Sequence, residues 1–188
     1  MKKWIAILLA LALMMSLAAC NKKDEDKQKG DVPASALEIL TNIWNGIPEE
    51  KRFFAMGGDM GSPVDNAPGN YSLTDEGLSA TLLVPAEQIG SIDQAASLMH
   101  AMMANNFTSG VFHMAKGVEA RDFADMMHQT IVNNRWLCGQ PEHFTIATIG
   151  GEYVLMYFGL NDTIEPFKNS LKTAYPDAVI NYDEAITE

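Results

Sequence analysis

Four segments of the chain carry hydrophobic residues at the spacing of an amphipathic α-helix. They are residues 34–47, 91–107, 119–137 and 162–175. In each, apolar positions recur every three or four residues, as they do on the buried face of a helix. Residues that cap helices precede or open three of the segments, and these are Asp31, Ser91 with Gln94, and Asp162 with Glu165. We therefore expect four helices, each with one buried face.

Other segments are richer in β-branched and aromatic residues. Residues 143–149 and 152–158 have this composition, and Gly150-Gly151 between them is typical of the two-residue turn of a tight β-hairpin. Residues 71–84 are expected to form a short hairpin, or a turn that leads into one strand at 78–84. Residues 109–115 are expected to form another strand. Both faces of 152–158 are apolar, so we expect the hairpin strands to be covered on two sides.

These elements predict an α+β domain over residues 32–188, with helices packed on a mixed or antiparallel sheet in the order α-β-α-β-α-β-β-α. Residues 55–70 are rich in Gly, Pro, Asp and Asn, which predicts a long loop. Structureless loops of this length in a compact domain are commonly functional or mobile. No fixed period relates the segments, so no repeat is predicted.

The N-terminus has the organisation of an export signal. Two lysines precede the apolar run 4–15, which at twelve residues is too short for the ~20 that a membrane-spanning helix needs. The run ends in Leu17-Ala18-Ala19-Cys20, which resembles the lipobox of bacterial lipoproteins. This resemblance implies a signal peptide at 1–19, cleavage between Ala19 and Cys20, and acylation of Cys20 with diacylglyceryl and fatty-acyl groups such as palmitate.

Residues 20–31 then form a tether, because the stretch after Cys20 is charged and has no aliphatic or aromatic residue to bury. The expected location is the extracytoplasmic face of the cell membrane, with the lipid bilayer as a partner through acylated Cys20. The alternative is an ordinary secretory signal whose cleavage leaves an incidental cysteine.

Charge excludes one class of partner. From Val32 onward there are seven basic and twenty acidic residues, a net charge of −13, within a whole-chain charge of −11. Such a domain repels phosphate backbones, so nucleic-acid binding is not expected. Cys138 is the only cysteine of the domain, which excludes an internal disulfide. It is expected to be a buried small residue, with a reactive thiol as the alternative.

A second resemblance involves Val111-Phe112-His113-Met114, the helix after it, and Gly150-Gly151-Glu152-Tyr153-Val154-Leu155-Met156 before a closing helix. In this order the segments resemble an uncharacterised family of small lipoproteins from Gram-positive gut bacteria, over roughly residues 34–176. The resemblance implies no activity, and it transfers no catalytic residue, metal ligand or cofactor.

Candidate chemistry is sparse and each candidate has an ordinary structural explanation. Metal ligands are considered at Asp122, Asp125 and His128 on one helix, although their side chains diverge and suit a solvated helix face. His100 is expected at the edge of the core, satisfied by a backbone carbonyl, with a metal ligand as the alternative. Calcium ligands are considered at Asp59, Asp65, Asn70 and Asp75, whose spacing misses the usual calcium-loop pattern. A Cu(I) site or a methionine-rich core is considered at Met99, Met102, Met103, Met126 and Met127.

The sequence favours a non-catalytic module that binds an envelope protein or a small ligand, without a metal or cofactor. No nucleophile frame such as G-x-S-x-G is present. The rival is a hydrolase, which should bring Asp59 or Asp65 together with His113, His128 or His143 in one concave pocket. A purely structural envelope protein should instead show no cleft and a large exposed apolar patch.

Overall fold

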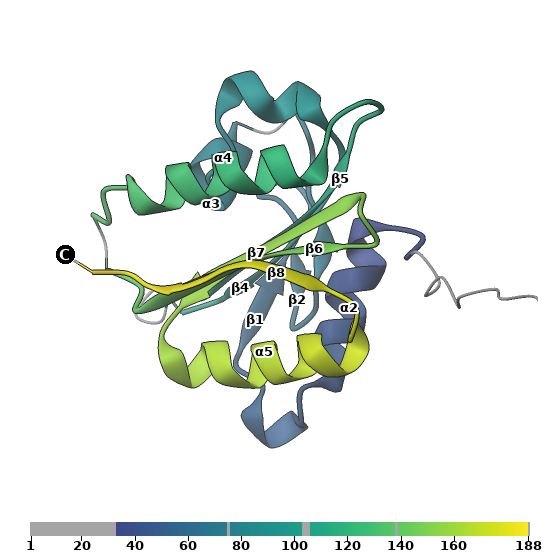
Figure 1. Ribbon diagram of the computed structural model, residues 1–188. Helices are drawn as coiled ribbons and strands as arrows, with labels where there is room; N and C mark the ends of the chain where they lie inside the picture. The colour runs from purple at the N-terminus through teal and green to yellow at the C-terminus, as the bar shows by residue number, and fades with distance from the viewer. Residues whose placement is uncertain (1–32, 75, 103–105, 138, 188) are drawn as a thin grey trace, which may run out of the picture.

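An antiparallel sheet forms the middle layer of the computed structural model, which describes residues 33–74, 76–102, 106–137 and 139–187 (Figure 1). Its strands are β1 (Ala55–Gly57), β2 (Val64–Asp65), β3 (Gly69–Asn70), β4 (Ile92–His100), β5 (Thr108–Met114), β6 (His143–Ile149), β7 (Tyr153–Gly159) and β8 (Val179–Ala185). Their order is β2-β1-β4-β5-β7-β6-β8, and β3 also pairs with β4. The predicted α+β class is confirmed, and the sheet is antiparallel.

Helices cover both faces of this sheet. They are α2 (Ala36–Gly46), α3 (Gly77–Leu82), α4 (Ala120–Val132) and α5 (Asn161–Ala174), with 3-10 turns at Glu49–Lys51 and Ala86–Ser91. Helices α2 and α5 lie on one face, and α3 and α4 lie on the other (Figure 1). Among the described residues, no helix is long and apolar enough to cross a membrane.

The core is divided between the two faces, and β7 contributes to both halves. All seven residues of β7 are buried. Tyr153, Leu155 and Tyr157 pack with α2 and α5, whereas Val154, Met156 and Phe158 join the cluster of α3 and α4. The expectation that the hairpin strands are covered on two sides is therefore confirmed for β7.

The predicted hairpin is present, with a loop one residue longer than expected. Strands β6 and β7 pair antiparallel up to Ile149 and Tyr153, which leaves Gly150, Gly151 and Glu152 between them. The φ angles of Gly150 and Gly151 are +62° and +80°, a region that glycine enters at little cost. Tight hairpin loops require such positive φ angles, which explains why this element was predictable.

The helix predicted at 91–107 is wrong, because this segment contains strand β4. Ala95 packs on the α3 and α4 side, whereas Ala96 and Leu98 pack on the α2 side. A strand buried on both faces is apolar at consecutive positions. Such a run also satisfies a helical spacing, so periodicity alone could not distinguish the two.

The strand predicted at 78–84 is wrong as well, because its first part is the short helix α3. Leu78 and Leu82, four residues apart, are both fully buried, and Leu83 ends the helix in the left-handed region with φ +57°. The predicted loop 55–70 contains the short strands β1, β2 and β3. Gly57 makes their close approach possible, since a Cβ there would lie 2.3 Å from the backbone nitrogen of Gly69.

Several helix ends also differ from the prediction. Helix α2 is capped by Ser35, whose Oγ accepts a hydrogen bond from the Glu38 N–H at 3.1 Å, while Asp31 lies outside the described residues. Helix α4 ends at Val132 rather than at 137. Helix α5 has no side-chain cap at its N-cap residue, and the Glu142 carboxylate accepts the Asn161 N–H at 2.9 Å.

Strand β5 confirms the strand predicted at 109–115, but β8 was not predicted. Strand β8 lies at the edge of the sheet, paired only with β6 along its length. Most of its side chains are exposed, so it lacks the apolar alternation by which strands are found in a sequence.

Candidate functional site

A pocket of about 180 Å³ opens between α3 and the β1–β4 part of the sheet. It is lined by Met56, Gly58, Asp59, Met60, Pro63, Tyr71, Thr81 and Met99. The strand register explains its position: Ala55 and Leu98 face α2, so the next residues, Met56 and Met99, face the opposite side. These two methionines are direct cross-strand partners.

Asp59 belongs to this pocket, but its carboxylate has a structural role. One oxygen, Oδ1, accepts the backbone N–H groups of Gly61 and Ser62, each at 2.9 Å. The other oxygen, Oδ2, accepts the N–H of Ser72 at 2.9 Å. Both oxygens are thus used to hold the loop after β1 against the segment after β3, which favours a structural carboxylate over a general base.

The grouping expected of a hydrolase is not found in this pocket. Its described lining contains Asp59 but none of His113, His128 and His143. Each histidine is paired elsewhere. The shortest contact of His113 is with Asp93 at 2.5 Å, that of His128 with Glu184 at 3.2 Å, and that of His143 with Asp183 at 2.7 Å. The three histidines are therefore paired with three different carboxylates, and none of them shares the pocket with Asp59.

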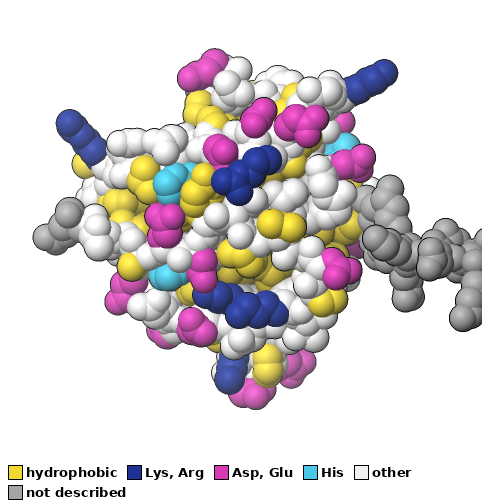
Figure 2. Space-filling model, viewed as in Figure 1, with side chains coloured by type: hydrophobic (Ala, Val, Ile, Leu, Met, Phe, Trp, Pro, Cys, Tyr) yellow, Lys and Arg dark blue, Asp and Glu magenta, His cyan; other side chains and the backbone are white. Residues whose placement is uncertain are grey.

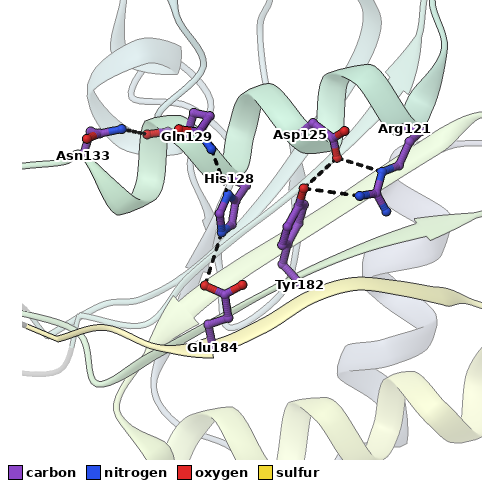
Figure 3. Close-up of polar contacts among 7 residues, drawn as sticks. All are labelled: Arg121, Asp125, His128, Gln129, Asn133, Tyr182 and Glu184. Carbon is purple, nitrogen blue, oxygen red and sulfur yellow. Dashed lines mark hydrogen bonds and ion pairs between the residues drawn. The ribbon is translucent and has the colours of Figure 1, made fainter.

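Two of these histidines attach the edge strand β8 to the rest of the domain. On the α4 side, His128 stacks on Tyr182 with ring centroids 3.9 Å apart and planes inclined by 17° (Figure 3). The Tyr182 hydroxyl donates to Asp125 at 2.8 Å, and Arg121 pairs with the same carboxylate at 2.7 Å. Acidic, basic and histidine side chains are interspersed over this side of the molecule (Figure 2).

On the α5 side, Asp183 of β8 is the centre of a second cluster. It accepts hydrogen bonds from Lys168, from His143 at 2.7 Å and from Thr145 at 3.0 Å. Partial burial alone would raise its pKa, but these donors outweigh burial and lower the pKa of Asp183 below its usual value. The carboxylate is therefore held ionised as part of the attachment of β8.

The candidate metal ligands do not converge. Asp125 and His128 have the different partners described above, and Asp122 lies in the first turn of α4. Among the residues with described positions, no group of three or more His, Cys, Asp or Glu side chains could hold a metal ion. This finding covers the proposed calcium ligands Asp59 and Asp65, whereas Asn70 belongs to strand β3 and Asp75 lies outside the described residues.

His100 lies at the edge of the core, as expected, but its backbone contact is to an N–H group rather than to the expected carbonyl. Its ring stacks on Phe53 with centroids 5.0 Å apart, and burial lowers the pKa of the imidazole. The Nδ1 atom accepts the backbone N–H of Met102 at 3.0 Å. A neutral ring that accepts this hydrogen bond explains the position without a ligand.

The methionines considered for copper separate in the structure. Met99 lines the pocket, Met102 is exposed after β4, and Met127 is fully buried under α4. Met103 lies outside the described residues, as do Cys20 and Cys138, so the predictions for them remain predictions. Met56 and Met60 were not among the sequence candidates, because residues 55–70 have the composition of a loop and no local spacing relates the two residues to Met99.

Comparison with known proteins adds no relative of this chain. No family model matches it, and neither a curated protein nor a solved structure is significantly similar to it.

Proposed function

We propose that this chain is a lipid-anchored, extracytoplasmic binding module, and that it binds a small apolar ligand or an apolar side chain of an envelope protein in the pocket between α3, β1 and β4. The observation that carries the proposal is the lining of this pocket. Methionine, tyrosine and proline side chains form most of it, and the carboxylate of Asp59 is occupied by three backbone N–H groups. Apolar concave sites with few polar groups are the usual form of ligand pockets.

Pocket size limits the ligand. A cavity of about 150 Å³ lined by apolar side chains is large enough to bind benzene, so about 180 Å³ suits one ring or a short alkyl chain. Drug-sized ligands usually occupy about 300 Å³ or more. The flexible side chains of methionine allow such a site to adapt to ligands of different shape.

Membrane anchoring in the proposal rests on the N-terminal sequence. The lipobox-like Leu17-Ala18-Ala19-Cys20 and the short apolar run before it favour acylation at Cys20. The first described helix, α2, begins at Ala36, shortly after the charged stretch expected to be the tether. An anchored domain with a small apolar pocket can present this site to partners in the cell envelope.

Toluene titration of the mature chain, residues 20–188 with Cys20→Ser, tests ligand binding. Met methyl groups labelled with ¹³C serve as NMR reporters, and the signals of Met56 and Met99 should shift with toluene concentration. Thr81→Phe should abolish these shifts by filling the pocket, whereas Ala80→Phe, an exposed position on the same helix, should leave them unchanged. Absence of shifts in the parent protein, or their persistence in Thr81→Phe, would contradict the proposal.

A further inference from the structure

The pocket has an unusual composition for an apolar site. Among the described residues that line it, the flexible aliphatic side chains are all methionine, namely Met56, Met60 and Met99, and none is leucine, isoleucine or valine. The two core clusters, by contrast, are built mainly from branched aliphatic and aromatic side chains. Burial of apolar surface alone does not call for this choice, since leucine fills such space equally well.

These three methionines are also more accessible than the methionines of the core. Met56 and Met99 are half-buried, and Met60 is 84% exposed. Met114, Met127 and Met156 are buried within the cluster of α3 and α4. The thioethers of the pocket can therefore be reached by a ligand, and those in the core cannot.

Backbone structure brings the three side chains to the same place. Met56 and Met99 face each other across the β1–β4 pair, where side chains of direct partners lie close together. Met60 comes from the loop after β1, which is held in position by the hydrogen bonds of Asp59 to Gly61, Ser62 and Ser72. Two thioethers on rigid strands and one on a fastened loop thus border one small pocket.

We propose that the pocket binds Cu(I) through the thioether sulfurs of Met56, Met60 and Met99. Thioethers are soft ligands that select Cu(I) over harder divalent ions. The charge around the site also suits a cation, because Asp65 is the cross-strand partner of Met56 and the lining, as far as the structure describes it, contains no lysine or arginine. Binding involves no redox step, since the ion enters and stays as Cu(I).

This inference goes beyond the proposed function, because it assigns a soft cation to the pocket for which an apolar ligand is proposed. Substitution of methionine by leucine separates the two proposals. Leucine keeps the apolar character and approximate volume of the side chain but has no sulfur. A variant with leucine at all three positions should therefore lose Cu(I) and still bind toluene.

The experiment is an anaerobic competition for Cu(I) with bathocuproine disulfonate, a coloured Cu(I) chelator, followed by absorbance. All proteins are residues 20–188 with Cys20→Ser and Cys138→Ser, because thiolates also bind Cu(I). We expect the parent to bind one Cu(I) per chain. The triple variant Met56→Leu/Met60→Leu/Met99→Leu should bind at least about tenfold more weakly, a change of 1.4 kcal/mol.

Met102→Leu and Met126→Leu serve as matched controls, because neither residue lines the pocket. Both variants should remove Cu(I) from the chelator as effectively as the parent does. Titration with Ag(I), a soft ion without accessible redox chemistry, should give the same order of affinities, with the parent and the two controls above the triple variant. Circular dichroism and toluene binding show that the triple variant is folded with an intact pocket.

Failure to remove Cu(I) from the chelator, or equal binding by the parent and the triple variant, would overturn the copper proposal. In either case, toluene binding that depends on Thr81 would leave the proposed apolar site standing. If the parent protein does not bind toluene, the proposed function is contradicted instead.

Discussion

Asp183 of β8 accepts the Nε2–H of His143 on β6 at 2.7 Å, although its direct cross-strand partner on β6 is Thr145, two residues further along. Lys168 from α5 and Thr145 from β6 donate to the same carboxylate. One acidic side chain on an otherwise exposed strand thus connects the sheet to a helix. The arrangement explains how β8 is held although it buries little apolar surface.

Replacement of Asp183 by Asn should make the free energy of unfolding less dependent on pH. The pKa of Asp183 is lowered in the folded protein, so its contribution to stability is present above the unfolded value of about 3.9 and is lost as the pH falls through the folded pKa. The parent should therefore be more stable than Asp183→Asn at pH 7, and the two should converge below about pH 4. Urea unfolding between pH 3 and 7 measures this difference.

Asp177→Asn, at an exposed position before β8, is the matched control for that experiment. It should follow the parent across the pH range. A constant difference between parent and Asp183→Asn from pH 7 to pH 3 would contradict the assigned role of the carboxylate.

Cys20→Ser should release the domain from the membrane fraction or leave it as an unprocessed precursor. The reason is that the twelve-residue apolar run is too short to span the bilayer, so acylation at Cys20 is the expected anchor. Fractionation of cells followed by immunoblotting, with intact-mass measurement of the purified chain, checks this outcome. A variant that matures normally and remains in the membrane fraction would refute the lipid anchor.

Residues 32–188 should fold without a metal or a disulfide. The two buried clusters on either side of the sheet provide the apolar burial that a domain of this size requires. Thermal unfolding with and without a chelator and a reductant should give midpoints within about 5 °C of each other, a shift that corresponds to somewhat more than about 1 kcal/mol in a domain of this size. A larger decrease would indicate a structural ion or bridge.

Valine at both Gly150 and Gly151 should lower the free energy of unfolding by more than about 2 kcal/mol. Both residues have positive φ angles, and a Cβ at Gly151 would meet no atom within 4 Å, so the cost there comes from backbone strain rather than from a clash. Urea unfolding measures the loss. Gly90→Val is the matched control, because a Cβ there also meets nothing within 4 Å and its φ is not positive.

Retention of parental stability by the double valine variant would mean that the loop does not require its present backbone conformation. The antiparallel pairing of β6 and β7, on which the centre of the fold depends, would then need revision.

Local sequence was sufficient to predict an element where the requirement for that element is confined to neighbouring residues. Gly150 and Gly151 satisfy a loop with positive φ angles, and the hairpin was predicted with only a one-residue error in its loop. Helices α2, α4 and α5 were predicted because each buries a single face, so its apolar residues recur every three or four positions. The charge of −13, which disfavours nucleic-acid partners, also follows from residue types alone.

Tertiary structure decided strands β4 and β8 and the pocket, because the residues that contact one another there are far apart in the chain. Strand β4 has neighbours on both faces, and burial on both faces removes the alternation that distinguishes a strand from a helix. Strand β8 is held by polar contacts to residues such as His143, about forty positions earlier. The pocket forms only when the β1–β4 register places Met56 beside Met99, a pairing across 43 residues that no local pattern encodes.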